Sequence, residues 1–355
     1  STRHGVRRQR QMCIRDRLPT INQQGLRGGV LYFDGQFDDA RLLINLAQTA
    51  VEQGAALANY VQVTQLLMDS GKVVGAAVRD HESESEWRIR ARVVVNATGA
   101  FVDGVRRMDD VQAKPIIAPS QGIHVVLDRD FLPGDNALLV PKTRDGRVLF
   151  AIPWHGALLA GTTDTPIRET SLEPRPMEHE VEFVLQTLGD YLTRKPSRDD
   201  IRSTFAGIRP LVKRGSGKNT SKLSRDHTIE ISDRGLLTIT GGKWTTYRHM
   251  AEDCMDRAVE IGDLDRKPCA TKSLKIHGHC EETDSLGTRW YYGSDATHVD
   301  ELASSEETSA QLHKELPYDM ADVVWAARQE PGQPGPRAGR CCRRDWPGVR
   351  GSGFG

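Results

Sequence analysis

The chain has 355 residues, 38% of them hydrophobic and 27% charged, which is typical of a folded protein of about two domains rather than of a disordered chain. Forty-eight basic residues balance forty-eight acidic ones, and a net charge of zero argues against a nucleic-acid partner. No apolar run approaches the roughly 18 residues that a membrane-spanning helix needs, so we expect no such helix, while peripheral attachment to a membrane stays open. Six scattered cysteines form no disulfide framework and indicate a reducing compartment, and we expect a cytoplasmic location.

The two ends differ in composition from the middle of the chain. Residues 1–20 are rich in arginine and contain no apolar stretch of the kind that a signal peptide needs. Residues 331–355 are rich in glycine, proline and arginine, and such a composition cannot bury enough apolar surface to offset the entropy of ordering. We therefore expect both ends to lie outside the fold, as foreign or disordered sequence. A basic arm or transit peptide at the start and a native tail at the end are the alternatives.

The first half of the remaining chain predicts a helix followed by strands. Asp38 precedes apolar residues that are spaced for one helix face, and Gly54 would end that helix. Residues 73–78 and 92–99 are predicted strands. The second is apolar on successive residues, as expected for a strand covered on both faces. Short β runs with turns between residues 121 and 165 predict an antiparallel sheet.

The second half continues this alternation. The apolar residues between Val181 and Leu192 share one face of a predicted helix. Residues 227–232 and 235–240 would form two strands around a turn, and a helix would begin near Trp244. Residues 268–330 are expected to form a separate, mostly helical segment.

Two patterns suggest other functions but lack a required part, and a third pattern is absent. GSGKNTS resembles a phosphate-binding loop, but Asn219 stands where the Walker pattern requires Ser or Thr. The HGHC segment at 277–280 has no second cluster to complete a four-ligand site, so we expect no bound metal. The dinucleotide fingerprint G-x-G-x-x-G does not occur in the sequence.

Two segments carry residues that suit a ligand site. VVVNATGA is an apolar strand that ends at Gly99, where the absence of a Cβ lets the backbone approach a bulky ligand. An ordinary strand and turn is the alternative. TFAGIRPL holds Arg209 between a glycine and a proline, and arginine presents a rigid fork for a phosphate or carboxylate. A solvated loop arginine is the alternative.

Two further segments indicate anion binding. In LSRDHTIEI, Arg225 precedes an alternating strand, although Asp226 could be its partner. In LTITGGKWTTYR, a strand runs into Gly241 and Gly242, then into Lys243 and a helix. Unpaired N–H groups at such a helix start favour electron-rich oxygens or anions, and the lysine adds a full positive charge. A tight turn with hydroxyl caps is the alternative, but it does not explain the lysine.

These motifs together resemble the FAD-dependent glycerol-3-phosphate dehydrogenases, which belong to the glutathione-reductase-like, D-amino-acid-oxidase-type flavoproteins. The resemblance runs in register over roughly residues 28–330 through DDARL, VVVNATGAFVD, IHVVL, FAIPW, GTTDT, SRDDI, AGIRPL, SRDHTIEI and GGKWTTYR. AGIRPL, SRDDI and GGKWTTYR are specific to this family. The resemblance implies FAD-dependent oxidation of sn-glycerol 3-phosphate to dihydroxyacetone phosphate, with electrons passed to a membrane quinone.

The fold that the resemblance implies is α/β. It would contain an incomplete FAD-binding Rossmann-like domain, an antiparallel-sheet substrate domain and a truncated C-terminal helical domain. The implied parts are a basic stretch outside the family at 1–27, the partial FAD-binding domain at 28–118, the substrate domain at 119–235, a strand–GG–helix return to the FAD domain at 236–262, the partial helical domain at 268–330 and the tail at 331–355.

Carried over by motif, the resemblance gives roles to residues of this sequence. The residues that would contact FAD are Val63, Thr98, Gly99, Gly241, Gly242, Thr245 and Thr246. The substrate would be held by Arg209, Arg225 and Lys243, because a buried phosphate dianion must be paired. Lys243, close to flavin and substrate, is also a catalytic candidate. The other is His124, which would take the hydroxyl proton during hydride transfer from C2 to flavin N5, although a lone histidine in an apolar strand is more often a core residue.

The sequence departs from the family in two features. It lacks the opening strand with G-x-G-x-x-G that holds the FAD pyrophosphate, and it lacks the HGG-x-R-Y-L motif. The chain therefore looks like a fragment, and we expect it to bind FAD weakly or not at all. An oxidase that passes electrons to oxygen and a non-catalytic α/β binding module are the alternatives. A homodimer stays open, and the intact family member is expected to associate peripherally with the membrane.

Overall fold

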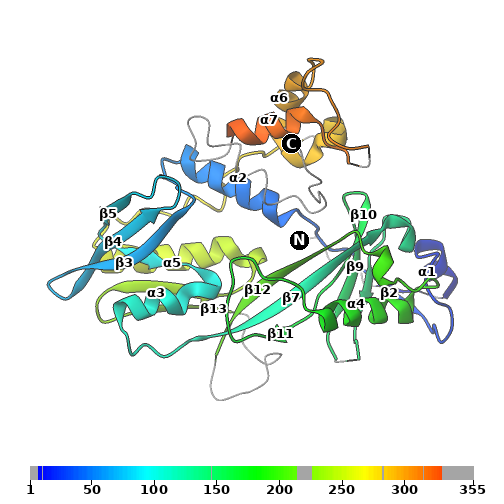
Figure 1. The fold of residues 1–355 in the computed structure, drawn as a ribbon, viewed down its shortest axis with the longest axis horizontal. Coiled ribbons are helices and arrows are strands. Elements are labelled where there is room, and N and C mark those ends of the chain that lie inside the picture. Colours follow the sequence, from blue (N-terminus) through cyan, green and yellow to red (C-terminus); the bar gives the residue numbers. More distant parts are fainter. Residues whose placement is uncertain are drawn as a thin grey trace.

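The computed structural model describes residues 7–9, 11–144, 146–213, 226–281, 284–314 and 316–329. In these ranges the chain forms a large antiparallel sheet, two three-stranded sheets beside it, and a helical C-terminal segment (Figure 1). The combination of helices and sheets confirms the expected α/β class. Arg225 and the expected tail at 331–355 lie outside the described residues.

The large sheet is built around its longest strand, β7. Its strands are β7 (Ile117–Asp128), β8 (Leu138–Val140), β9 (Leu149–Trp154), β10 (Ala157–Gly161), β11 (Thr165–Pro166) and β12 (Ser203–Val212). β12 pairs along one side of β7, and β10 and β11 pair along the other. Ile123, Val125 and Leu127 of β7 are fully buried on one face, because helix α4 (Glu178–Tyr191) packs its apolar side there. The opposite face of the sheet is therefore the one available to a ligand.

The two smaller sheets lie next to each other. One contains β3 (Val61–Asp69), β4 (Lys72–Asp80) and β5 (Glu86–Arg90), all antiparallel, and the other contains β6 (Val94–Asn96), β14 (Leu236–Gly241) and β13 (His227–Ile231). β6 and β14 are far apart in sequence but pair in parallel. Leu66, Val73 and Leu236 form a small buried cluster that joins the two sheets.

Five helical elements of the described chain surround these sheets, and the two at residues 99–109 were not predicted from the sequence. They are α2 (Asp39–Glu52), the 3-10 turn η1 (Gly99–Phe101), α3 (Val102–Asp109), the 3-10 turn η5 (Trp244–Thr246) and α5 (Tyr247–Gly262). Asp38 caps α2 by accepting the backbone N–H of Arg41 at 2.9 Å, as expected of an aspartate at this position. The predicted helices at 38–54 and 181–192 are confirmed as α2 and α4.

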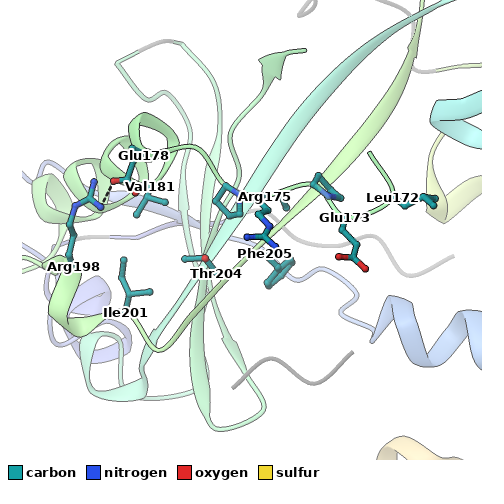
Figure 2. Close-up of a pocket in the computed structure, with 12 residues that line it drawn as sticks. Leu172, Glu173, Arg175, Glu178, Val181, Arg198, Ile201, Thr204 and Phe205 are labelled. Atoms are coloured by element: carbon teal, nitrogen blue, oxygen red, sulfur yellow. Dashed lines mark ion pairs between the residues drawn. The ribbon is translucent and has the colours of Figure 1, made fainter. Parts of the chain in front are cut away.

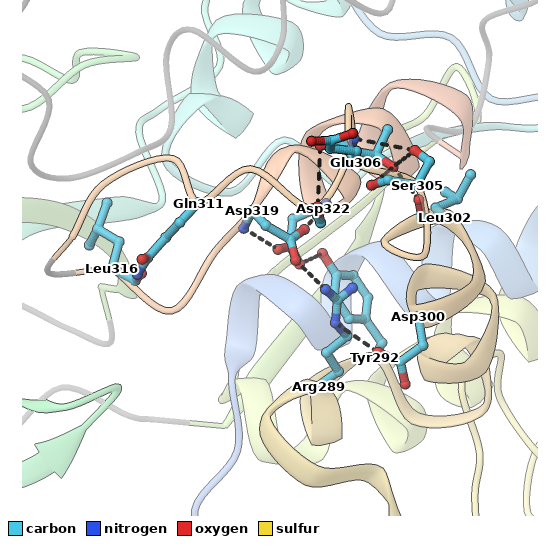
Figure 3. A network of polar contacts seen from close by, with 12 residues as sticks. Arg289, Tyr292, Asp300, Leu302, Ser305, Glu306, Gln311, Leu316, Asp319 and Asp322 are labelled. Atoms are coloured by element: carbon cyan, nitrogen blue, oxygen red, sulfur yellow. Dashed lines mark hydrogen bonds and ion pairs between the residues drawn. The ribbon is translucent and has the colours of Figure 1, made fainter.

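The C-terminal segment contains short helices with a core of their own. These are η6 (Asp284–Asp295), α6 (Ala296–Leu302) and α7 (Met320–Gln329). The buried carboxylate of Asp322 accepts the hydroxyl of Tyr292 at 2.8 Å, and Arg289 pairs with Asp300 and Asp319 (Figure 3). None of the helices in the described ranges combines the length and the apolar composition that crossing a bilayer requires.

Two expectations about these elements are wrong. We expected no element before Gly28, but α1 (Gln11–Arg17) forms, and Leu18 and Ile21 after it are buried in the main core against α4 and the large sheet. Two apolar side chains at the right positions were enough to dock this stretch. The strand at β6 is also not covered on both faces, since Val95 points to a face on which it is 40% exposed.

Candidate active site

The face of the large sheet opposite α4 brings Arg209, His124 and Phe205 together. In the register between β7 and β12, Phe205 stands opposite His124 and Arg209 stands opposite Ser120. Because side chains alternate between the two faces of a strand, these residues all point away from α4. The rings of His124 and Phe205 stack with their centroids 5.1 Å apart. One cation and one imidazole thus lie on neighbouring positions of a single surface.

Glycine makes room for the guanidinium of Arg209. A Cβ on Gly122 would lie only 2.3 Å from Nη2 of Arg209, so any other residue at this position would displace the group. Nη2 donates to Oγ1 of Thr162 at 2.8 Å, and Nη1 donates to the main-chain oxygen of Thr163 at 3.0 Å. Arg209 belongs to a ten-residue strand and is not the solvated loop arginine that the sequence left open.

His124 is held in its neutral form. Burial is the main cause that lowers its pKa to about 4, and the positive charge of Arg209 adds to this effect against a small opposing influence of Asp39. Gly161 makes room for the ring, since a Cβ there would lie 2.4 Å from Cδ2 of His124. A neutral imidazole has a lone pair that can accept a proton from a substrate hydroxyl, but the lowered pKa makes His124 a weaker base than a free imidazole.

A second group of predicted residues lies where two parallel strands end. Asn96 of β6 pairs with Thr238 of β14, so the chain beyond both strands reaches the same edge of the sheet. Gly99 and Gly241 lie at this edge with φ of +56° and +79°, in the left-handed region that favours glycine. Gly99 has nothing within 4 Å of its Cβ position, so its backbone is accessible to a ligand.

Two buried polar atoms in this region lack a partner. Among the described residues, neither Nε1 of Trp244 nor Oγ1 of Thr240 makes a hydrogen bond. A buried donor or acceptor without a partner costs about 1–3 kcal/mol. A ligand with polar groups at this edge would satisfy them.

The two groups of residues lie on adjacent elements. A Cβ on Gly241 would lie 2.8 Å from Cγ2 of Val212 on β12. Val212 is three residues along that strand from Arg209, a separation of about 10 Å. Val212 pairs with Ile117 and therefore points to the face opposite Arg209, so this contact places the glycine turn beside β12 but not on the face that carries the arginine.

The remaining predicted residues are more dispersed. Lys243, Thr245 and Thr246 are exposed in the turn after β14, and the carbonyl of Lys243 accepts the N–H of Thr246 at 3.0 Å. Thr98 is exposed and donates its hydroxyl to Asn96 at 2.7 Å. Val63 lies apart from all of these, on β3 of the neighbouring sheet.

A hollow lies elsewhere, at the outer edge of β12. It has a volume of about 700 Å³ and is lined by the loop before α4, with Arg175 and Phe205 on its wall (Figure 2). Neither His124, Arg209 nor the glycine turn lines it. We therefore base the candidate site on the sheet face and not on this hollow.

Comparisons with known proteins identify the family of the chain. The family described as FAD dependent oxidoreductase (DAO) matches residues 2–248, which is most of the chain. The chain belongs to this family of FAD-dependent oxidoreductases. Membership shows that the expected α/β flavoprotein fold and the FAD cofactor are correct.

Named relatives of this FAD-dependent oxidoreductase are glycerol-3-phosphate dehydrogenases. A probable mitochondrial one from Caenorhabditis elegans is 40% identical over 341 residues, covering 88% of this chain and 47% of the relative. A mitochondrial one from Arabidopsis thaliana is 42% identical over 329 residues, covering 89% and 52%. The chain thus spans about half the length of the curated relatives it matches. The crystal structure of glycerol-3-phosphate dehydrogenase from Bacillus halodurans, complexed with FAD, matches with a TM-score of 0.73 and 30% identity, covering 83% of this chain and 62% of that one.

The residues at the strand ends fit the FAD that the family implies. The open backbone at Gly99, the left-handed turn at Gly241–Gly242 and the unpartnered atoms of Thr240 and Trp244 all lie at one sheet edge. In open α/β sheets this is the edge where ligands bind. No group of three or more His, Cys, Asp or Glu side chains that could hold a metal ion occurs in the described part of the chain.

Several residues that build the site were not predicted from the sequence. They are Gly122 and Gly161, which make room for Arg209 and His124, and Thr162 and Thr163, which hold the guanidinium. The motif GTTDT was recognised only as part of the resemblance. Nothing in its composition indicates that the Arg209 side chain reaches it across β7, because that contact depends on the register of the folded sheet.

Proposed function

We propose that the chain oxidises sn-glycerol 3-phosphate to dihydroxyacetone phosphate with FAD, as part of a glycerol-3-phosphate dehydrogenase. The observation that carries the proposal is the Arg209 guanidinium, fixed over Gly122 beside a neutral His124. A fixed guanidinium suits a phosphate, because its fork donates two parallel hydrogen bonds to neighbouring oxygens. The names of the relatives support the same substrate.

The residues of the chain would have separate roles in substrate binding and proton transfer. Arg209 binds the phosphate and so fixes the position of the three-carbon alcohol along the sheet face. His124, neutral at physiological pH, takes the proton of the C2 hydroxyl as C2 becomes a carbonyl. FAD, when bound, supplies the acceptor for the hydride that leaves C2. Lys243 adds positive charge at the glycine turn, and Gly242, Thr245 and Thr246 offer polar groups to the flavin edge.

Other parts of the proposal go beyond the substrate. We propose a quinone at the membrane surface as the electron acceptor and peripheral association with that membrane. Several relatives are named as mitochondrial proteins, and the cytoplasmic location expected from the cysteines stays a prediction. Arg225, expected to assist Arg209, lies outside the described residues and stays a prediction too.

Binding of the substrate is tested by isothermal titration of the protein, with and without added FAD, using sn-glycerol 3-phosphate and glycerol as matched ligands. We expect binding of the phosphorylated ligand only. A hydrogen-bonded contact between charged groups contributes about 1.5–3 kcal/mol, so Arg209→Ala should weaken binding about 10- to 150-fold. Equal affinity in the wild-type protein and the Arg209→Ala variant would remove Arg209 from the site.

Catalysis is tested by anaerobic mixing of the protein, in the presence of excess added FAD, with sn-glycerol 3-phosphate. Loss of the visible flavin absorbance is expected. Subsequent addition of oxygen or of a soluble quinone distinguishes an oxidase from a dehydrogenase, because only the oxidase forms peroxide rapidly. Substrate binding without any loss of absorbance would indicate a non-catalytic binding module.

A further inference from the structure

A carboxylate is buried beneath the sheet face that carries the site. Glu180 lies in the first turn of α4 and is only 1% exposed. Its Oε1 accepts the hydroxyls of Thr165 at 2.6 Å and Thr163 at 3.0 Å. Its Oε2 accepts Nε2 of Gln121 at 2.8 Å and the N–H of Met177 at 3.0 Å. Four donors thus converge on one side chain.

The carboxylate is held in its charged form by these donors. Burial opposes ionisation, but the hydrogen bonds from Thr165, Met177, Gln121 and Thr163 outweigh it and hold the pKa of Glu180 below its usual value. A charged acceptor makes stronger hydrogen bonds than a neutral one. The segment 163–165, which donates two of these hydrogen bonds, is therefore held tightly.

The same segment holds Arg209 on its other side. The hydroxyl of Thr163 donates to Glu180 and accepts the N–H of Ile123 at 3.1 Å, which fixes residue 163 against β7. The main-chain oxygen of Thr163 and the hydroxyl of Thr162 then accept both terminal nitrogens of Arg209. Glu180 is thus connected to the guanidinium through two residues, although it lies on the opposite side of the sheet.

We propose that Glu180 is a positioning residue that fixes the 162–163 segment and thereby aims the Arg209 guanidinium at the substrate phosphate. The part of this inference that concerns phosphate rests on the proposed function, whereas the part that concerns the placement of Arg209 does not. Glu180 touches neither substrate nor flavin in this role. It acts only through Thr162 and Thr163.

A contribution to stability alone explains Glu180 poorly. Buried ionic groups can often be replaced by apolar residues of similar volume at no cost in stability, and α4 already packs on the sheet through Val184, Leu185 and Leu188. One donor to Glu180, the N–H of Met177, belongs to the N-cap of α4 and forms an ordinary capping contact. The other three come from Gln121 of β7, from Thr165 of β11 and from Thr163 in the segment that holds Arg209. This placement suits the fixing of a loop more than the filling of a core.

The test compares Glu180→Ala and Glu180→Gln with two matched controls. Glu178→Gln changes the same charge on an exposed position of α4, and Leu188→Ala weakens the α4 core without touching the network. The glutamine retains an oxygen for Thr163 and Thr165 but turns an amide toward the donors of Met177 and Gln121. We therefore expect an intermediate effect from Glu180→Gln and the full effect from Glu180→Ala.

The first measurement is the pKa of His124, followed by NMR of its imidazole. Arg209 helps to keep this pKa low, so displacement of the guanidinium should raise it. The pKa is expected to rise in Glu180→Ala toward its value in Arg209→Ala, to rise less in Glu180→Gln, and to stay unchanged in both controls. A His124 pKa that rises in Arg209→Ala but not in Glu180→Ala would overturn the proposal, because Arg209 would then keep its place without Glu180.

The second measurement is steady-state kinetics of the protein, in the presence of excess added FAD, with sn-glycerol 3-phosphate. A misplacement of about 1 Å costs on the order of 100-fold, so KM should rise by that order in Glu180→Ala, while Leu188→Ala keeps its KM. A KM that changes equally in Glu180→Ala and Leu188→Ala would mean that Glu180 serves stability only. If no variant binds the phosphate but the His124 pKa moves as expected, the proposed substrate is wrong and the positioning role stands.

Discussion

The space above Gly122 gives the sharpest prediction about the site. In a Gly122→Ala variant the new Cβ would lie 2.3 Å from Nη2 and 2.4 Å from Nη1 of Arg209, well inside any allowed contact. The guanidinium must then leave its acceptors on Thr162 and Thr163, because β7 is paired on both sides and cannot move away. The variant tests the placement of Arg209 without removing its charge.

The magnitude follows from the contacts that are lost. The new Cβ meets only the end of the flexible Arg209 side chain, so the cost in stability should be small. Loss of an aligned charged contact to phosphate costs about 1.5–3 kcal/mol of binding, so the KM for sn-glycerol 3-phosphate should rise about 10- to 150-fold. The pKa of His124 should rise as well, since the positive charge moves away from the ring.

The chain offers a matched control for this experiment. Gly207 stands opposite Gly122 in the β7–β12 register, and a Cβ there meets nothing within 4 Å. Gly207→Ala should leave the KM and the His124 pKa unchanged. The assays are steady-state kinetics and NMR titration of both variants. A Gly122→Ala variant that behaves like Gly207→Ala would refute the placement of Arg209 described here.

Three further predictions concern pH and stability. The pKa of His124 is about 4 in the folded protein and about 6.5 in the unfolded chain. The unfolded chain therefore takes up a proton that the folded protein does not, and the free energy of unfolding should fall by about 3 kcal/mol as the pH falls from about 6.5 to about 4. In urea unfolding, the His124→Asn variant should lose less stability over this pH range than the wild-type protein. Burial would lower the pKa of His277, but its hydrogen bonds to Asp295 and Glu52 outweigh burial and raise it. The His277→Gln substitution should therefore lower the free energy of unfolding more at about pH 6, where the histidine is charged, than at about pH 9. Equal decreases at the two pH values would contradict this. Asp38→Ala should cost about 1 kcal/mol by removing the cap of α2, measured by the same unfolding assay.

Local patterns in the sequence predicted those elements whose signal is local. The helix face between Val181 and Leu192 and the Asp38 cap depend on residues within a few positions of each other, and both are confirmed in α4 and α2. The same holds for the strands around the turn before β14. Arg209 and His124 were identified as candidates from their motifs, and the structure brings them onto one face.

The sequence could not predict features that arise from distant parts of the chain. Glu180 looks like one more solvated glutamate at a helix start, and only the fold brings Gln121 and Thr163 to it. Gly122 looks like an ordinary strand glycine until the register sets Arg209 above it. The docking of α1 was missed for a similar reason, since Leu18 and Ile21 gain their burial from α4 and the large sheet, far along the chain.

The most direct test of the account is a crystal structure of the protein with FAD and sn-glycerol 3-phosphate. The account predicts that the phosphate lies within hydrogen-bond distance of both terminal nitrogens of Arg209 and that the C2 hydroxyl faces His124. A phosphate bound away from Arg209, for example in the hollow beside Arg175, would contradict it.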